Sequence, residues 1–131
     1  MAVQRDVRVE RVHDEVREHP EGAGAVRARF LVDRLWPRGV RKSALEGVAW
    51  LKDAAPSQAL RTWFAHDPSR FEVFAERYRD ELRGRPEVLE PLLAAARRGP
   101  VTLLYAARDT EHNHALVLRD HVRGLLAGGS N

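Results

Sequence analysis

The stretch from residue 30 to residue 39 is an apolar run that ends abruptly in charged residues, and it constrains the fold more than any other part of the sequence. Its first three residues are aromatic or branched and favour a β-strand, which Pro37 and Gly39 prevent from continuing. A buried strand therefore brings Asp33, Arg34 and Arg38 to its C-terminal end. Ligands of open α/β sheets bind at this edge, and two arginines beside one carboxylate suit an anion.

The length and the residue usage limit the class of protein. A chain of 131 residues is long enough for one domain with a hydrophobic core of its own. The absence of cysteine excludes disulfides, cysteine nucleophiles and thiolate metal sites. No run approaches the roughly 20 apolar residues of a membrane span, and the N-terminal residues are too charged for a secretory signal. These features predict a cytoplasmic protein that makes no contact with membranes.

The charge of the chain is only weakly informative. There are 22 Lys and Arg residues against 19 Asp and Glu residues, so that the net charge is +3 and the pI is near 9.9. Twenty of the 22 basic residues are arginines, which suits a phosphate-binding surface but is better explained by compositional drift from lysine to arginine. The composition therefore permits nucleic-acid binding without implying it.

The N-terminal part of the chain predicts one strand and one loop. Residues 3–12 alternate between apolar and charged side chains, which is the pattern of a half-exposed strand. Residues 13–26 contain a proline and two glycines among polar residues and predict a flexible loop. His13 and His19 lie in this loop without a third metal ligand at a recognised spacing, so we expect no function for them.

Helices are expected through the middle of the chain. A short helix or turn over residues 43–51 should bury Leu45, Val48 and Trp50. Ser57 is a suitable N-cap for the helix that follows.

The clearest amphipathic helix begins after Asp67 and Pro68, an N-cap and a first-turn proline, and ends at Gly84. Its inward face consists of apolar residues at spacings of three and four, namely Phe71, Phe74, Ala75, Tyr78 and Leu82. Either Pro86 or Pro91 begins the next helix.

Residues 101–106 are apolar almost without interruption, as expected of a central strand that is covered on both faces. Asp109 or Thr110 can cap the final helix, and a frayed tail is expected from Gly128 onward. A strand, a helical crossover and a second strand form a right-handed parallel unit, so the strands at 30–32 and 101–106 should open on the same edge. The sequence therefore predicts an α/β fold: a small single domain with a short, mainly parallel sheet flanked by helices.

The shared edge of these two strands is the expected site. The charged end of the first strand should there face Arg108 and the N-terminus of the final helix, whose free N–H groups favour anions. The residues available as acid or base groups are Asp33, His66 and His112. The residues available to bind a ligand are Arg34, Arg38, Arg61, Arg108, Asn113 and His114.

Structural roles are the alternative for the same residues. Arg34 and Arg38 can instead pair with Asp33 and hold the loop rigid. His66 suits a helix C-cap, and Asn113 with its two flanking histidines suits hydrogen bonding around the start of the final helix.

No metal or cofactor is expected. His112 and His114 stand two residues apart, which on a helix separates their side chains by about 200° around the axis. The sequence contains no P-loop, dinucleotide fingerprint, Gly-x-Ser-x-Gly elbow or His-Glu-x-x-His motif. A base-stacking platform needs aromatic rings exposed side by side. We expect the large aromatic residues in the core instead: Trp36, Trp50, Trp63 and Tyr105.

Several long motifs, spread in order over nearly the whole chain, resemble one bacterial family. They are Val32-Asp33-Arg34-Leu35-Trp36-Pro37-Arg38-Gly39, Ala55-Pro56-Ser57, Leu60-Arg61-Thr62-Trp63-Phe64-Ala65-His66-Asp67-Pro68, Tyr78-Arg79-Asp80-Glu81-Leu82, and Thr102-Leu103-Leu104-Tyr105-Ala106-Ala107 with His112-Asn113-His114-Ala115. The chain resembles the YeaO-like proteins of domain of unknown function 488, which implies an α/β fold and no established activity. It departs from their pattern at residues 26–29, at Ala59 and at Arg108, where the family usually has Asp-Gly-aromatic-Arg, a glutamate and a lysine.

Three functions remain open from the sequence. The first is a small enzyme or ligand-binding domain for an anionic, for example phosphorylated, small molecule at the C-terminal edge of the sheet. The second is a nucleic-acid-binding or regulatory protein, in which exposed arginines follow a phosphate backbone. The third is a structural or interaction module whose charged loop only stabilises the fold.

Overall fold

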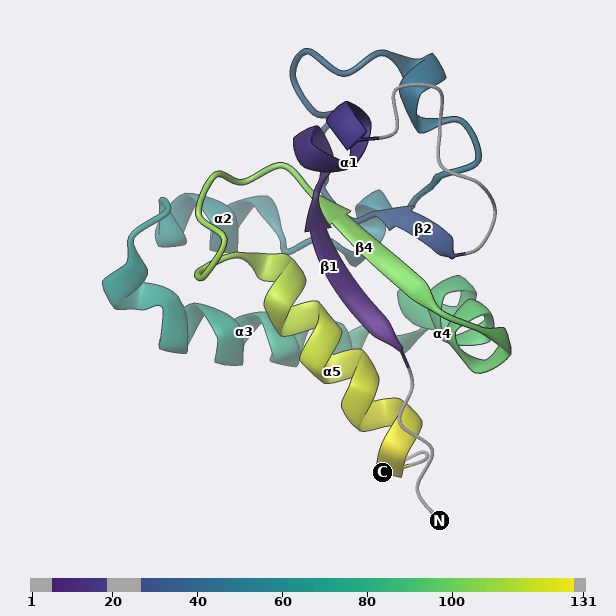
Figure 1. Ribbon diagram of the computed structural model, residues 1–131. Coiled ribbons are helices and arrows are strands. Elements are labelled where there is room, and N and C mark those ends of the chain that lie inside the picture. Colours follow the sequence, from purple (N-terminus) through teal and green to yellow (C-terminus); the bar gives the residue numbers. More distant parts are fainter. Residues whose placement is uncertain (1–5, 19–26, 129–131) are drawn as a thin grey trace.

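A four-stranded parallel sheet forms the centre of the protein (Figure 1). The structure is a computed structural model and describes residues 6–18 and 27–128. The strands are β1 (Val7–Arg11), β2 (Ala28–Leu31), β3 (Ala49–Trp50) and β4 (Val101–Tyr105), in the spatial order β1-β4-β2-β3, and all pairs are parallel. The predicted α/β class with a short parallel sheet is confirmed.

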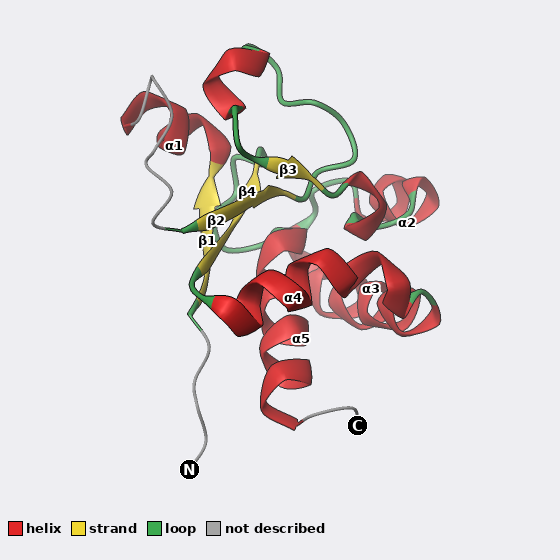
Figure 2. Ribbon diagram, turned by 90° about the vertical axis from the view of Figure 1, so that its right-hand side faces the viewer, coloured by secondary structure: helices red, strands yellow, loops and turns green. Residues whose placement is uncertain are grey.

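Five α-helices flank this sheet in the described residues: α1 (Val12–Glu18), α2 (Gln58–Phe64), α3 (Phe71–Gly84), α4 (Glu90–Arg98) and α5 (His114–Gly128). Figure 2 shows the sheet nearly edge-on, with α1 on one side and with α3, α4 and α5 on the other. None of the helices in the described ranges is long and apolar enough to span a membrane.

The two faces of the sheet carry separate hydrophobic clusters, because neighbouring residues of a strand point to opposite faces. Leu103 packs in the larger cluster with Phe74 and Tyr78 of α3, whereas Leu104 packs in the smaller cluster with Val12 of α1. All five residues of β4 are buried, and β4 pairs with both β1 and β2. The prediction of an interior strand parallel to β2 is therefore confirmed.

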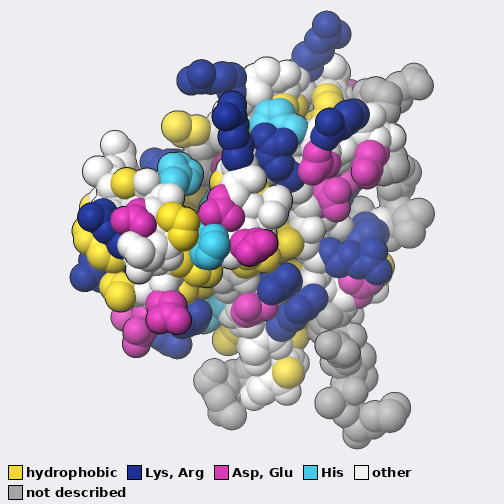
Figure 3. Space-filling view, turned by 60° about the vertical axis from the view of Figure 1, so that its left-hand side comes forward, with side chains coloured by type: hydrophobic (Ala, Val, Ile, Leu, Met, Phe, Trp, Pro, Cys, Tyr) yellow, Lys and Arg dark blue, Asp and Glu magenta, His cyan; other side chains and the backbone are white. Residues whose placement is uncertain are grey.

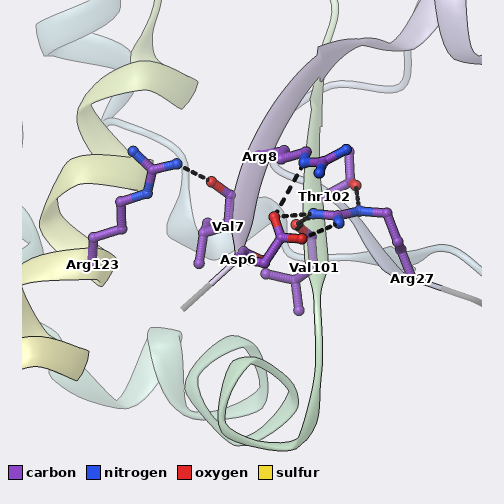
Figure 4. Close-up of polar contacts among 7 residues, drawn as sticks. All are labelled: Asp6, Val7, Arg8, Arg27, Val101, Thr102 and Arg123. Carbon is purple, nitrogen blue, oxygen red and sulfur yellow. Dashed lines mark hydrogen bonds and ion pairs between the residues drawn. The ribbon is translucent and has the colours of Figure 1, made fainter. Parts of the chain in front are cut away.

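Arg27 joins the N-terminal ends of three strands (Figure 4). Its Nη1 and Nη2 donate to the two carboxylate oxygens of Asp6 at 2.7 and 3.0 Å. Its Nε donates to Oγ1 of Thr102 at 2.7 Å, and Nη2 also donates to the backbone oxygen of Val101 at 2.6 Å. The guanidinium thus connects the residues before β1 and β2 with the start of β4.

Residues 13–18 are helical, which corrects the expectation of a loop throughout residues 13–26. Val16 follows Val12 by one helical turn, and both pack in the smaller cluster. Glu15 on the same helix pairs with Arg29 of β2 at 3.0 Å, and both side chains are nearly buried. Two valines and one ion pair therefore hold α1 on the sheet, although its sequence is mostly polar. The rest of the expected loop lies outside the described residues.

The segment between β2 and α2 differs from its prediction in two respects. A 3-10 turn forms at Lys42–Leu45 and buries Leu45, as expected of a short helix or turn, but residues 49–50 form β3 at the edge of the sheet, and a second 3-10 turn follows at Lys52–Ala54. Trp50 is 40% exposed rather than buried, and its ring lies edge-to-face on Trp36 with the centroids 5.4 Å apart. These two tryptophans therefore lie side by side: Trp36 is partly buried and packs against the smaller cluster, whereas the prediction that Trp50 belongs to the core is wrong.

Most of the predicted helix signals are confirmed, and the start of α5 is corrected. Ser57 caps α2 by accepting from the N–H of Leu60, and Asp67 accepts from the N–H of Ser69 just before α3. Pro86 begins a 3-10 turn and Pro91 lies in the first turn of α4, so each proline begins an element of its own. The final helix begins at His114, later than a cap at residue 109 or 110 predicts, and it still includes residue 128.

Candidate functional site

A pocket of about 490 Å³ opens at the C-terminal ends of β2 and β4. It brings together eight of the nine residues that the sequence presents as site candidates: Asp33, Arg34, Arg38, Arg61, His66, His112, Asn113 and His114. Arg108, the ninth, is exposed and does not line the pocket. The convergence follows from the parallel sheet, because the segments after β2 and β4 leave it at the same edge.

Arg34 and Arg61 are the distinctive groups of this pocket. Arg34 follows β2 and Arg61 lies on α2, so that they reach the pocket from different elements. The Nε atom of each is buried and has no hydrogen-bond partner within the described structure. Burial of an unpaired donor costs free energy, and burial of a charged one costs more. The pocket therefore contains two cationic groups that the protein itself does not satisfy.

Arg38 is the third cation of the pocket, and its side chain is exposed. Two side chains hold the loop that carries Arg38. Within the loop, Trp36 Nε1 donates to the backbone oxygen of Val40 at 2.7 Å, and from α1, His13 Nε2 lies 3.0 Å from the backbone oxygen of Arg38. Gly39 has φ of +77°, the left-handed conformation that glycine adopts without strain. The loop is thus held in place while the Arg38 guanidinium is left without a recorded partner in the described residues.

Asp33 connects three elements instead of pairing with the arginines beside it. Its Oδ2 accepts from the backbone N–H of Ala106 at 3.1 Å, and its Oδ1 lies 3.3 Å from Nε2 of His114. Its backbone oxygen accepts from Nε1 of Trp50 at 2.7 Å. No ion pair joins Asp33 to Arg34 or Arg38 in the described structure. The carboxylate is therefore used to tie the end of β2 to the end of β4 and to α5.

His114 is held at the first residue of α5. Its Nε2 also lies 3.0 Å from the backbone oxygen of Val32, which can only accept, so Nε2 carries a hydrogen. The ring packs edge-on against Tyr78, whose hydroxyl donates to the backbone oxygen of Ala54. Burial raises the pKa of Tyr78 above its usual range, and the charges of Glu81 and Asp33 add to this effect.

His112 lies in the turn before α5 and His114 is the first residue of α5. The assumption that both histidines lie on one helix is therefore wrong. Its Nδ1 is 2.9 Å from Oδ2 of Asp109, and its ring stands edge-on to Phe71. The other oxygen of Asp109 accepts from the backbone N–H groups of Glu111 and His112. The N–H of Glu111 is the main cause that lowers the pKa of Asp109, and the imidazole of His112 contributes. Asp109 thus caps this turn rather than α5.

Asn113 caps α5. Its Oδ1 accepts from the N–H of Leu116 at 3.1 Å, and its Nδ2 donates to the backbone oxygen of Asp109 at 2.9 Å. The residue is buried, so both halves of its amide are used inside the fold. The hydrogen-bonding interpretation of Asn113 therefore describes its contacts in the structure.

His66 lines the pocket from the exposed turn between α2 and α3. Ala65, with φ of 49°, is the C-cap residue of α2, and His66 follows it with φ of 56°. The His66 ring contacts the ring of Phe64 with the centroids 6.2 Å apart. Among the pocket histidines, His66 is the one whose ring nitrogens have no recorded hydrogen bond in the described structure.

The rest of the wall is apolar, with Trp36, Pro37, Phe64 and Phe74 among its residues. Side chains of Ser, Thr, Cys, Lys and Tyr are absent from the described lining. Three His, Cys, Asp or Glu side chains do not come together to form a metal site in the described part of the chain. The apolar wall was not predicted as part of the site, since its aromatic residues carry the ordinary pattern of core residues.

The pocket and the sheet define a small parallel α/β protein with a cationic cleft at the C-terminal strand edge. Residues 6–129 match the family described as the inactive DUF488-N3 subclade, so the chain belongs to the DUF488 proteins. Uncharacterized protein Rv3073c of Mycobacterium tuberculosis (strain H37Rv) is 40% identical over 118 residues, which cover 90% of this chain and 94% of the relative. Uncharacterized protein YeaO of Escherichia coli K12 is 43% identical over 97 residues, 74% of this chain and 84% of YeaO. The resemblance to YeaO-like proteins is thus confirmed, and no solved structure matches the chain.

Proposed function

We propose that this protein is a binding domain for a small anionic molecule that carries a phosphate or carboxylate group. The observation that carries the proposal is the pair of buried Nε atoms of Arg34 and Arg61, which have no hydrogen-bond partner in the described structure and belong to residues on the wall of one pocket. An oxyanion supplies acceptors for both guanidinium groups, and guanidinium matches the planar geometry of phosphate and carboxylate oxygens. The exposed Arg38 adds a third charge at the entrance.

Binding is favoured over catalysis by the chemistry of the wall. The described lining offers no hydroxyl, thiol or amine nucleophile. Asp33 accepts from the backbone N–H of Ala106, His114 donates to the backbone oxygen of Val32, and His112 is engaged with Asp109. The family description, an inactive subclade, agrees with this choice. In this proposal Asp33 and His112 position the walls of the pocket, and His66 contacts the ligand at the entrance.

The ligand is larger than an inorganic ion. A volume of about 490 Å³ lies within the range of sites that enclose small organic molecules, and much of the wall is apolar. The anionic group therefore lies against the arginines, while the remainder of the molecule packs on rings such as Phe64 and Trp36.

Ligand-dependent stabilisation tests this proposal. The parent protein is titrated with phosphate, sugar phosphates and aromatic carboxylates at fixed ionic strength, and its free energy of unfolding is followed. A ligand at a hundred times its dissociation constant that binds only the folded state should stabilise it by about 2.7 kcal/mol. Arg34→Gln and Arg61→Gln should lose this stabilisation, while Arg98→Gln, an exposed arginine at the end of α4, should retain it.

The same variants also test the opposite interpretation. If Arg34→Gln and Arg61→Gln strongly destabilise the ligand-free protein and no anion stabilises the parent, these arginines support the fold and the proposal is wrong.

A further inference from the structure

The positive charge of the protein is concentrated in the segment that runs from the end of β2 to the start of the 3-10 turn after β3. Residues 34–52 contain five basic residues, Arg34, Arg38, Arg41, Lys42 and Lys52, against a single acid, Glu46. The whole chain has a net charge of only +3, so the remainder is close to neutral. Both lysines of the chain lie in this segment, which we call the basic segment.

Four of these five cations are exposed: Arg38, Arg41, Lys42 and Lys52. None of the four has a side-chain hydrogen bond or ion pair recorded in the described structure. In Figure 3, Lys and Arg side chains gather at the top of the molecule, at the height where Figure 1 shows the chain between β2 and β3. The charge is thus available to a partner and is not neutralised within the fold.

Exposed apolar side chains lie within the same segment. Leu35 is 68% exposed and Trp50 is 40% exposed, and these are two of the three large hydrophobic residues that the described structure exposes. Trp50 is held by its hydrogen bond to the backbone oxygen of Asp33 and by edge-to-face contact with Trp36. Lys52 places its Nζ 5.5 Å from the centre of the Trp50 ring. The ring is therefore held in place and partly exposed, with the ammonium group of Lys52 over it.

We propose that the basic segment binds a single-stranded nucleic acid, with a base stacked on Trp50 and with phosphates on Lys42, Lys52 and the exposed arginines. Aromatic platforms beside basic side chains are how proteins bind single strands without sequence preference. A duplex would hide its bases from Trp50. A single strand can place its phosphates on the basic side chains and a base on Trp50 at the same time.

The basic segment also supplies Arg34 and Arg38 to the pocket. A strand bound along it can place a terminal phosphate against Arg34 and Arg61, and this part of the inference rests on the proposed anion-binding function. Binding along Trp50 and the lysines does not depend on it.

Fluorescence anisotropy of a labelled oligothymidylate of about twelve nucleotides tests the inference, since single-strand sites span roughly 4–16 nucleotides. We expect Trp50→Ala to weaken binding roughly tenfold, as loss of one stacked base does, and Trp50→Phe to restore most of it. The double variant Lys42→Gln/Lys52→Gln should reduce the dependence of log affinity on log salt by about 1.4, from two lost phosphate contacts. Arg98→Gln is the matched control, and circular dichroism checks that each variant is folded.

Other probes separate the possible failures. A 5′-phosphate on the oligonucleotide should increase affinity in the parent and not in Arg61→Gln. The inference is overturned if the oligonucleotide does not bind, if Trp50→Ala and the lysine variant bind like the parent, or if duplex DNA or phosphatidylserine vesicles bind more tightly. If the oligonucleotide does not bind while small phosphates still stabilise the parent through Arg34 and Arg61, the inference about the basic segment is wrong and the proposal of an anion-binding pocket is retained.

Discussion

Arginines at the two ends of the sheet are used in opposite ways. At the N-terminal end, Arg27 donates to two oxygens of Asp6, to Thr102 and to the backbone of Val101. At the C-terminal end, Arg34 and Arg61 keep buried Nε atoms without a partner in the described structure. The residue type is the same, and the number of satisfied donors distinguishes an arginine that stabilises the fold from one that is available to a ligand.

The difference has an energetic consequence. A paired guanidinium contributes to folding, whereas an unpaired one near other cations costs free energy until an anion arrives. Natural proteins tolerate such costs at functional sites. Substitutions at the two ends of the sheet should therefore change different properties. Substitution of Arg27 should lower stability, whereas substitution of Arg34 or Arg61 should weaken ligand binding.

The largest expected effect is the loss of Arg27. Arg27→Gln removes a largely buried guanidinium, takes two of the three donors from the Asp6 carboxylate and leaves the Val101 carbonyl without the Arg27 donor, so we expect a loss of about 2–3 kcal/mol in the free energy of unfolding. Arg34→Gln and Arg61→Gln should not lower the same quantity, because the guanidinium groups that they remove have unpaired buried donors. Urea denaturation measures both.

Arg8→Gln is the matched control at the N-terminal end, because Arg8 pairs with the same carboxylate of Asp6 from a 67% exposed position. An exposed pair of this kind contributes less than about 1 kcal/mol. If Arg27→Gln and Arg61→Gln lower the free energy of unfolding equally, arginines at the two ends of the sheet do not differ in their contribution to folding.

The next prediction distinguishes the role of Asp33 in the pocket from that of the arginines, and its expected effect on stability is smaller. Asp33→Asn weakens the acceptor of the Ala106 N–H and the contact with His114, which we expect to cost about 1–2 kcal/mol of stability. The same change removes the negative charge from the pocket, so phosphate should bind more tightly. Urea denaturation and a phosphate titration measure the two effects, and Asp53→Asn, an exposed acid of the 3-10 turn before α2, is the control. A loss of phosphate binding in Asp33→Asn would mean that Asp33 itself contacts the ligand.

The shared strand edge was predictable from the sequence for physical reasons. The apolar runs at residues 30–32 and 101–106 specify two buried strands, and the handedness of crossovers makes them parallel. These two facts are sufficient to bring the charged segment after β2 next to the start of α5. The approach of Arg61 follows only from the packing of α2, which the sequence does not specify.

The predictions that were wrong concern segments where the local sequence pattern is weak or where two residues fit the same role equally well. The helix α1 packs on the sheet through two valines, Val12 and Val16, and its polar contacts are with Arg29 and with the backbone of Arg38, which are distant in the sequence. Asn113 and Asp109 are equally good caps by residue type, so tertiary packing decided between them. Strand β3 has two residues and both are exposed, so it carries no periodicity to detect.

The smallest expected effect concerns the pH dependence that Arg27 imposes on Asp6. The hydrogen bond from Arg27 is the main cause that lowers the pKa of Asp6 below its usual 3.8, and the positive charge of the guanidinium adds to it. The folded state therefore binds fewer protons than the unfolded state near this pH. The resulting stabilisation is complete above the unfolded pKa and is lost as the pH falls through the lower folded pKa. Because Asp6 is largely exposed, the effect should be small and should weaken with added salt.

In Arg27→Gln the pKa of Asp6 should return toward its usual value, so the stability difference between parent and variant should shrink as the pH falls below about 4. An NMR titration of the Asp6 carboxyl carbon, combined with urea denaturation at two pH values, measures both quantities. Arg34→Gln should leave the Asp6 titration unchanged, because Arg34 lies at the other end of the sheet. If Asp6 titrates at the same pH in the parent and in Arg27→Gln, the guanidinium does not act on this carboxylate in solution, and Arg27 would contribute to folding only through Thr102 and Val101.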